Sequence, residues 1–306
     1  MIVSTDRRYS LARRIALLDA EQDCVEIYRL LSEHEFPWDL NQALSFALFR
    51  TYAVPSIGRL LHETGEFTER TQKRYEDTAL LLAEVLEHGP GSGRGRDAVR
   101  RVNQMHAAYD IRNDDLRYVL CTFVAVPIRW LDAYGWRPLT DHEKTASAHY
   151  YRELGRLMGI RDVPATWQDF AAALDAYERE HFGRDAGARA VADATLALMT
   201  TFPPNDRLPA GLVTRSSYAL MDDPLLDALG YPRPGAAVRR LVRGGLRLRG
   251  RVVRRLPPRE QSLHARDLPS MTLYRDGYVT EELGTFPRGC PGGADRAGPG
   301  RSHRPG

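Results

Sequence analysis

Arg74 and Thr78 place polar side chains on a helix face where apolar residues are expected. The segment 71–89 has the periodicity of an amphipathic helix, and its positions 74, 78, 82 and 85 share one stripe with Leu82 and Val85. Burying a guanidinium costs several kcal/mol unless an anion or strong hydrogen-bond acceptors meet it. The pair therefore predicts either a polar pocket inside a helical protein or an internal ion pair with a structural carboxylate.

His106 is expected to face the same interior from the next helix, 97–110. Val102, Met105 and Tyr109 form an apolar stripe on that helix, and His106 falls on the same stripe. A neutral imidazole is a common metal ligand, although a single histidine on an apolar face is more often a satisfied core residue. Spacing alone favours the structural interpretation over the functional one.

The elements that must position these side chains all have helical periodicity, and neither a run of alternating strand pattern nor an internal repeat is visible. Pro55 and Pro127 are expected to interrupt or kink two of the helices, and Thr140 with Glu143 predicts a capping box. The sequence predicts an all-α fold with helices in the segments 40–65, 71–89, 97–110, 113–135, 140–159, 164–182 and 186–202.

Length and composition are typical of a folded protein with a sizeable core. The chain has 306 residues, of which 43% are hydrophobic and 27% charged. We expect one helical domain over residues 1–284 and a disordered tail over 285–306, where Gly, Pro and Arg dominate. No apolar run reaches the roughly 18 residues that a bilayer span needs, and no signal-type segment is evident, so a cytoplasmic location is expected. Three scattered cysteines predict neither a disulfide framework nor a zinc site.

Several blocks of the sequence together resemble the mpaB-type oxygenases, which belong to the broad family that also contains the rubber oxygenase, or latex-clearing protein. The resemblance spans about residues 35–185 and continues weakly through 256–284. The blocks that carry it are "TYAVPSIGRLLHETGEF", "QKRYEDTALLLAEVLEHG", "VNQMHAAYDIRNDDLRYVLCTF", "PIRWLDAYGWRPLT" and "ELGRLMGIRDVPATW".

The resemblance implies a globin-like helical domain that holds a b-type haem. Members of the family share an Arg and a Thr four residues apart, followed about thirty residues later by the histidine that binds the iron. The pattern falls here on Arg74, Thr78 and His106. Arg74 would face the haem or its propionates, Thr78 would line the catalytic pocket, and His106 would be the proximal iron ligand. Rubber oxygenases carry a lysine just before that threonine, whereas this chain has Asp77, so rubber itself is not the expected substrate.

The resemblance implies haem-dependent oxygenation of a lipophilic small molecule, with O2 as co-substrate. Prenylated compounds are the candidate substrates, and oxidative cleavage of a C=C bond is the candidate reaction. Tyr118, Thr122 and Trp130 are candidates for lining the pocket, but the ordinary core interpretation of these three residues is favoured.

Other chemistries have weaker support. Glu178 and His181 supply only one of the two Glu-x-x-His motifs of a di-iron bundle, and a solvated helix face explains them better. Neither a phosphate-binding loop nor a Gly-x-Ser-x-Gly elbow is present.

The main alternative is a non-catalytic helical protein that binds anionic membrane surfaces. The segment 236–260 interleaves arginines with Val and Leu, as a peripheral contact with anionic lipid would require. Nucleic acid is not expected as a partner, because no stacking aromatic residues accompany these arginines.

Overall fold

The computed structural model describes residues 5–285, and every regular element within that range is helical. The all-α prediction is confirmed, whereas the globin-like arrangement stays a prediction. The predicted tail 285–306 lies outside the described residues except for Thr285. The α-helices are α1 (Thr5–Arg8), α2 (Ser10–Ile15), α3 (Cys24–Leu30), α4 (Pro37–Tyr52), α5 (Pro55–Glu63), α6 (Glu66–Glu69), α7 (Thr71–His88), α8 (Gly93–His106), α9 (Asn113–Tyr134), α10 (Asp141–Leu157), α11 (Trp167–His181), α12 (Ala186–Met199), α13 (Ala210–Leu220), α14 (Asp223–Leu229) and α15 (Ala236–Val253).

Four short segments complete the described helical structure. Leu31–Glu35 forms a π-helical turn between α3 and α4, and the 3-10 turns are Asn205–Arg207, Ala265–Asp267 and Thr280–Glu282.

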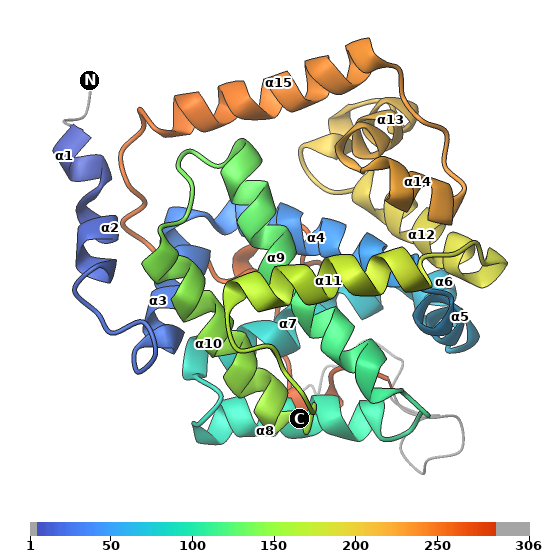
Figure 1. Cartoon of the computed structure of the whole chain (residues 1–306), viewed down its shortest axis with the longest axis horizontal. Helices are drawn as coiled ribbons and strands as arrows, with labels where there is room; N and C mark the ends of the chain where they lie inside the picture. Colours follow the sequence, from blue (N-terminus) through green and yellow to red (C-terminus); the bar gives the residue numbers. More distant parts are fainter. Residues whose placement is uncertain (1–4, 286–306) are drawn as a thin grey trace, which may run out of the picture.

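Helix α9 forms the centre of the molecule and packs against α4, α10, α11 and α15 (Figure 1). Its buried residues belong to one contiguous apolar cluster that extends from Ile15 to Leu283. Pro127 lies inside α9, so of the two predicted effects of this proline the break is wrong, whereas the kink stays a prediction. Because the neighbouring helices bury this part of α9, packing outweighs the hydrogen bond that the proline removes.

Other local signals act as the sequence predicts. Pro55 separates α4 from α5 and occupies the first turn of α5, where a missing N–H has no cost. Thr140 caps α10 by accepting a hydrogen bond from the Glu143 amide at 3.2 Å, while the Glu143 carboxylate accepts one from the Thr140 amide at 2.8 Å. The capping box is therefore confirmed.

Helices α7 and α8 form an antiparallel pair joined by a short connection. Gly89 ends α7 with a φ of 78°, which only glycine adopts readily, and Ser92 caps α8 by accepting from the Gly95 amide at 2.9 Å. A Cβ at Gly95 would lie 1.9 Å from the Gly89 carbonyl oxygen, so the chain can pass this closely only with glycine there. The turn thus sets the inner face of α7 opposite that of α8.

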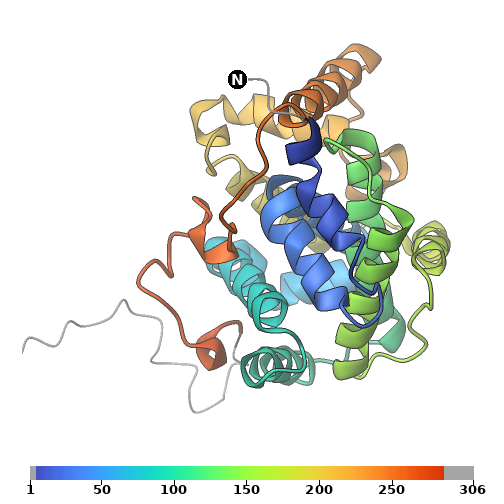
Figure 2. The same ribbon diagram turned by 90° about the vertical axis from the view of Figure 1, so that its left-hand side faces the viewer.

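The C-terminal part of the described chain occupies two separate places. In both views α15 lies along the top of the molecule, whereas α8 lies at the bottom (Figures 1 and 2). The segment that follows α15 returns past α7 and reaches α8 (Figure 2). Within residues 5–285, no helix combines the length and the apolar character needed to cross a membrane.

Candidate functional site

A cavity of about 550 Å³ lies between α4, α5, α7, α8, α9 and the end of α10. Arg74, Thr78 and His106 all line this cavity, so the structure brings the three predicted site residues together. The rest of the interior wall is mainly apolar and includes Leu81, Leu82 and Val85 of α7, Val102 and Met105 of α8, and Leu116, Val119, Leu120 and Phe123 of α9.

Arg74 has no carboxylate within ion-pair distance among residues 5–285. Its guanidinium donates a hydrogen bond to the Thr78 hydroxyl, and the Phe67 ring lies 5.0 Å from its Cζ. Burial lowers the pKa of Arg74, because the charged form loses solvation that no adjacent anion replaces. The described chain therefore does not pair Arg74 with a structural carboxylate, the alternative that the sequence had left open.

Thr78 orients the guanidinium. Its hydroxyl donates to the Arg74 carbonyl oxygen one turn earlier, at 2.8 Å, which leaves its lone pairs available to the Arg74 N–H. The hydroxyl hydrogen is thus committed to the backbone. Thr78 serves as an acceptor that holds Arg74 toward the cavity.

His106 is the last residue of α8, and its imidazole faces the cavity. Burial and, as the smaller cause, the positive charge of Arg74 lower the pKa of His106 to about 4. The side chain is therefore neutral at pH 7 and carries a free nitrogen lone pair, the form that binds metals. No other side chain or backbone group in residues 5–285 makes a hydrogen bond with its ring.

Asp77 does not face the cavity, although it precedes Thr78. One residue along a helix rotates the side chain by about 100°, and the Asp77 carboxylate is 1% exposed on a different face of α7. It binds Lys73 Nζ at 2.6 Å and accepts from the Tyr274 hydroxyl at 2.5 Å. The departure from the lysine of rubber oxygenases therefore places no carboxylate in the pocket.

Tyr118, Thr122 and Trp130 do not line the cavity but lie in the core, as the favoured interpretation had it. Tyr118 donates to the Arg50 carbonyl oxygen at 3.0 Å, and the Trp130 indole donates to Asp39 at 3.2 Å. The wall is formed instead by another face of α9, at positions 116, 119, 120 and 123. The i, i+3, i+4, i+7 spacing of these positions was the signal that could have identified them.

Glu178 and His181 have structural partners. The Glu178 carboxylate accepts from Arg50 Nε at 2.6 Å, and His181 Nδ1 donates to the Tyr177 carbonyl oxygen at 3.1 Å. Across the described residues, no three His, Cys, Asp or Glu side chains are grouped so that they could hold a metal ion. The expected solvated face is wrong for Glu178, which is 7% exposed because it pairs with Arg50 between helices.

The mouth of the cavity is polar, and the sequence analysis did not identify the residues that form it. Arg59 and Glu63 of α5, together with Asp110 and Arg112 in the connection between α8 and α9, line the cavity and are exposed. Residues 110–112 lie in a loop, where helical periodicity carries no signal. The opening therefore lies between α5 and this connection.

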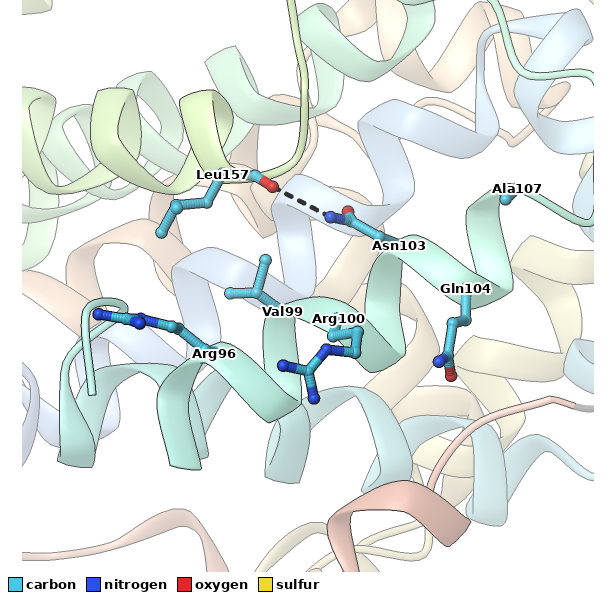
Figure 3. A pocket seen from close by; sticks show the side chains of 7 residues that line it. All are labelled: Arg96, Val99, Arg100, Asn103, Gln104, Ala107 and Leu157. Atoms are coloured by element: carbon cyan, nitrogen blue, oxygen red, sulfur yellow. Dashed lines mark hydrogen bonds between the residues drawn. The ribbon is translucent and has the colours of Figure 1, made fainter. Parts of the chain in front are cut away.

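An open groove of about 410 Å³ runs along the outer side of α8 (Figure 3). Val99 lines both the groove and the cavity, so it forms part of the wall between them. Asn103 donates to the Leu157 carbonyl oxygen at 3.0 Å and ties α8 to the end of α10 at this wall (Figure 3).

Comparison with known proteins adds independent information about this chain. Residues 40–255 match the family described as ER-bound oxygenase mpaB/B′/rubber oxygenase, catalytic domain. The chain is similar to the ER-bound oxygenase mpaB of Penicillium roqueforti, with 33% identity over 229 residues that cover 69% of this chain and 76% of that protein.

Two proteins of Penicillium brevicompactum are also similar. The ER-bound oxygenase mpaB′ is 32% identical over 277 residues, which cover 84% of this chain and 65% of the relative. The ER-bound oxygenase mpaB is 30% identical over 234 residues, which cover 71% of this chain and 60% of the relative. This chain thus spans less than two thirds of the length of these two relatives.

Proposed function

The chain belongs to the ER-bound oxygenase mpaB/B′/rubber oxygenase catalytic-domain family, and we propose that it is a haem-dependent oxygenase of a lipophilic small molecule. The observation that carries the proposal is the meeting of three side chains in one apolar cavity. His106 offers a neutral nitrogen without a hydrogen-bond partner in the described chain, and Arg74 offers a cation without a carboxylate, held by Thr78.

The residues present fit a haem b. A haem needs a nitrogen donor on one side, an apolar enclosure for the macrocycle, and a cation for its carboxylates. The cavity volume of about 550 Å³ falls in the usual range for cofactor and small-molecule sites, about 300–1,000 Å³. His106 supplies the donor, the leucines and valines of α7 and α8 supply the enclosure, and Arg74 supplies the cation.

Each residue then has a distinct role. His106 would bind the iron, and Arg74 would pair with a haem carboxylate while Thr78 orients its guanidinium. When bound, the haem would supply the binding and activation of O2. The apolar side chains of Leu82, Val85 and Phe123 would exclude water from the reacting groups.

The walls of the cavity support a lipophilic substrate, because aliphatic and aromatic side chains form most of the interior. The charged lining residues other than Arg74 and the buried Asp115 are exposed at the mouth. Prenylated compounds are the candidate class, and oxidative cleavage of a C=C bond is the candidate reaction. Both rest on the resemblance to oxygenases that act on isoprenoid chains.

The proposed function is tested by the colour of the protein. Protein expressed with a haem precursor should show a Soret band and a pyridine haemochrome of the b type, and it should consume O2 when a prenylated substrate is added. A colourless protein that also fails to bind added haemin in a titration would contradict the proposal. If such a protein sediments with anionic vesicles, the alternative of a non-catalytic membrane-binding protein is favoured.

We also propose a peripheral contact with an anionic membrane through α15, in line with relatives that are named ER-bound. Three arginines of this helix are used internally: Arg239 pairs with Asp223, Arg243 donates to the Ala219 carbonyl oxygen, and Arg249 pairs with Asp39. These contacts fix the inner face of α15 on the helical body.

The outer face of α15 joins apolar and basic side chains. Leu241 and Leu248 are 77% and 58% exposed, and together with Val252 they form one stripe at spacings of seven and four residues. Arg240, Arg247 and Arg251 are also exposed and have no carboxylate partner within residues 5–285. An apolar stripe with a basic flank is the surface that an interfacial helix presents to anionic lipid.

This contact would lie away from the mouth of the cavity. Helix α15 and helix α8, which leads into the mouth, lie on opposite sides of the molecule in both views (Figures 1 and 2). A bilayer at α15 would therefore hold the protein at the surface without sealing the opening.

Replacing Arg240, Arg247 and Arg251 together by Gln should weaken binding to anionic vesicles about 100-fold, because each arginine near such a surface contributes about 1 kcal/mol. Binding of the parent protein should also weaken with salt, since the Debye length is roughly 8 Å at physiological ionic strength. Cosedimentation measures both effects.

The matched control replaces three exposed arginines outside α15 and its flanking segments, Arg129, Arg156 and Arg161, by Gln. This variant has the same net charge as the α15 variant, so it should bind nearly as the parent protein does. Equal losses in the two variants would mean that net charge acts and that α15 is not the contact.

A further inference from the structure

The segment 270–285, here termed the C-terminal clamp, packs against α7 on a face turned away from the cavity. Three carboxylates of this face, Glu76, Asp77 and Glu84, are almost completely buried. Buried carboxylates are costly unless hydrogen bonds satisfy them, and the clamp supplies hydrogen bonds to each one.

The contacts with α7 follow the helix for about two turns. Glu76 accepts from the Thr272 amide at 2.7 Å and from the Leu273 amide at 3.0 Å. Asp77 accepts from the Tyr274 hydroxyl at 2.5 Å, and Glu84 accepts from the Tyr278 hydroxyl at 2.6 Å. Hydrogen bonds to ionised carboxylates are among the stronger ones, so they fix the rotation of α7 about its axis.

The end of the clamp binds α8 beside the proposed iron ligand. Arg101 Nε donates to the Leu283 carbonyl oxygen at 2.7 Å, and another N–H of its guanidinium donates to the Thr285 carbonyl oxygen at 2.8 Å. The Thr285 amide lies 3.2 Å from Met105 Sδ, and Thr285 itself lines the cavity. The clamp thus reaches the residue that directly precedes His106.

These contacts matter because of where the site lies in the α7–α8 pair. The connection after Gly89 joins the two helices at one end, whereas Arg74 lies near the start of α7 and His106 at the end of α8. The site is therefore at the open end of the helical hairpin, where the connecting turn constrains it least. The clamp links Asp77 on one helix with Met105 on the other at this open end.

We propose that the C-terminal clamp is a positioning element that sets the spacing and rotation of α7 and α8, and so the place of His106 relative to Arg74 and Thr78. Tyr274 and Arg101 are its positioning residues. This inference rests on the proposed function for its consequence, haem binding, but its effect on the helix pair is independent of haem.

Tyr274→Phe and Tyr278→Phe test the clamp as a matched pair. Each variant removes one hydroxyl that donates to a buried carboxylate of α7 and leaves the ring in place, but Asp77 lies toward the open end and Glu84 toward the connecting turn. Tyr274→Phe should weaken haemin binding about tenfold, whereas Tyr278→Phe should change it by less than threefold. A haemin titration followed by absorption measures both.

Hydrogen exchange of the haem-free full chain gives a second readout. Tyr274→Phe should speed exchange of the backbone amides around 101–107 about tenfold, while Tyr278→Phe should affect mainly the amides near 84–89. Tyr231→Phe, which removes the hydrogen bond to Asp193 and touches neither α7 nor α8, controls for a general loss of stability.

Equal effects of Tyr274→Phe and Tyr231→Phe on both measurements would overturn the inference, as would unchanged exchange at 101–107 in Tyr274→Phe. A parent protein that binds no haemin would contradict the proposed function, and the exchange experiment would then decide the clamp alone. If Tyr274→Phe does not fold, Gly284→Ala takes its place, since a Cβ there would lie 2.1 Å from Met105 Sδ and must displace the end of the clamp.

Discussion

His106→Ala is expected to yield a folded protein that has lost its haem. In the described chain, His106 is the histidine that lines the cavity, and its neutral imidazole is the strongest nitrogen donor available to an iron there. Removal of a partly buried side chain of this size should lower the free energy of unfolding by about 1–3 kcal/mol. The variant should therefore keep its helical circular dichroism while its Soret band disappears.

His149→Ala is the matched control for this prediction. His149 of α10 is also partly buried, but it lies near Glu21 and does not line the cavity. It should keep its haem at parent occupancy. Added imidazole should partly restore the Soret band of His106→Ala, because it supplies the missing nitrogen without the backbone tether.

Retention of haem with an unaltered spectrum in His106→Ala would refute the axial assignment. The ligand would then have to be sought among His62, His88, His142 and His149, none of which lines the cavity. A structural histidine would show only a lower melting temperature, with no spectroscopic change.

Arg74→Met is expected to weaken haem binding while leaving the haem-free protein at least as stable as the parent. The guanidinium has no carboxylate partner within residues 5–285, and burial lowers its pKa, so the charge costs free energy in the absence of an anion. Methionine keeps much of the length and removes that cost. Haemin titration should show a loss of about 10- to 100-fold, the usual size of one lost charge-assisted contact.

Arg137→Met provides the opposite case with the same substitution. Arg137 is buried between Glu35 and Glu143, at 3.0 Å and 2.7 Å. Its removal leaves the buried Glu143 without its cation and Glu35 with Arg8 alone, at 3.8 Å. The free energy of unfolding should fall by about 3–5 kcal/mol, as thermal or urea denaturation of the haem-free proteins would show. If Arg74→Met destabilises the haem-free protein as strongly as Arg137→Met does, Arg74 is a structural residue and not an anion receptor.

The sequence determined the helices and the direction of the side chains on them. The 3.6-residue period assigns Arg74, Thr78, Leu82 and Val85 to one face of α7 from spacing alone, and the cavity confirms that assignment. Gly89 and the Thr140–Glu143 box marked helix ends because their effects are local, within one turn of the backbone. The predicted break at Pro127 was wrong for the same reason, since a local rule cannot include the packing of neighbouring helices around α9.

Only the tertiary structure decided what each face meets. Spacing could not tell whether Arg74 would find a carboxylate, and the answer depends on which helices surround it. Asp77 stands where rubber oxygenases carry a pocket lysine, but its partner Tyr274 lies 197 residues away and holds its carboxylate on another face. The same holds for α15, where the arginines divide into internal contacts and an exposed basic flank. Periodicity describes one helix at a time, whereas partners, cavities and exposed surfaces arise from contacts between segments that the chain brings together only when it folds.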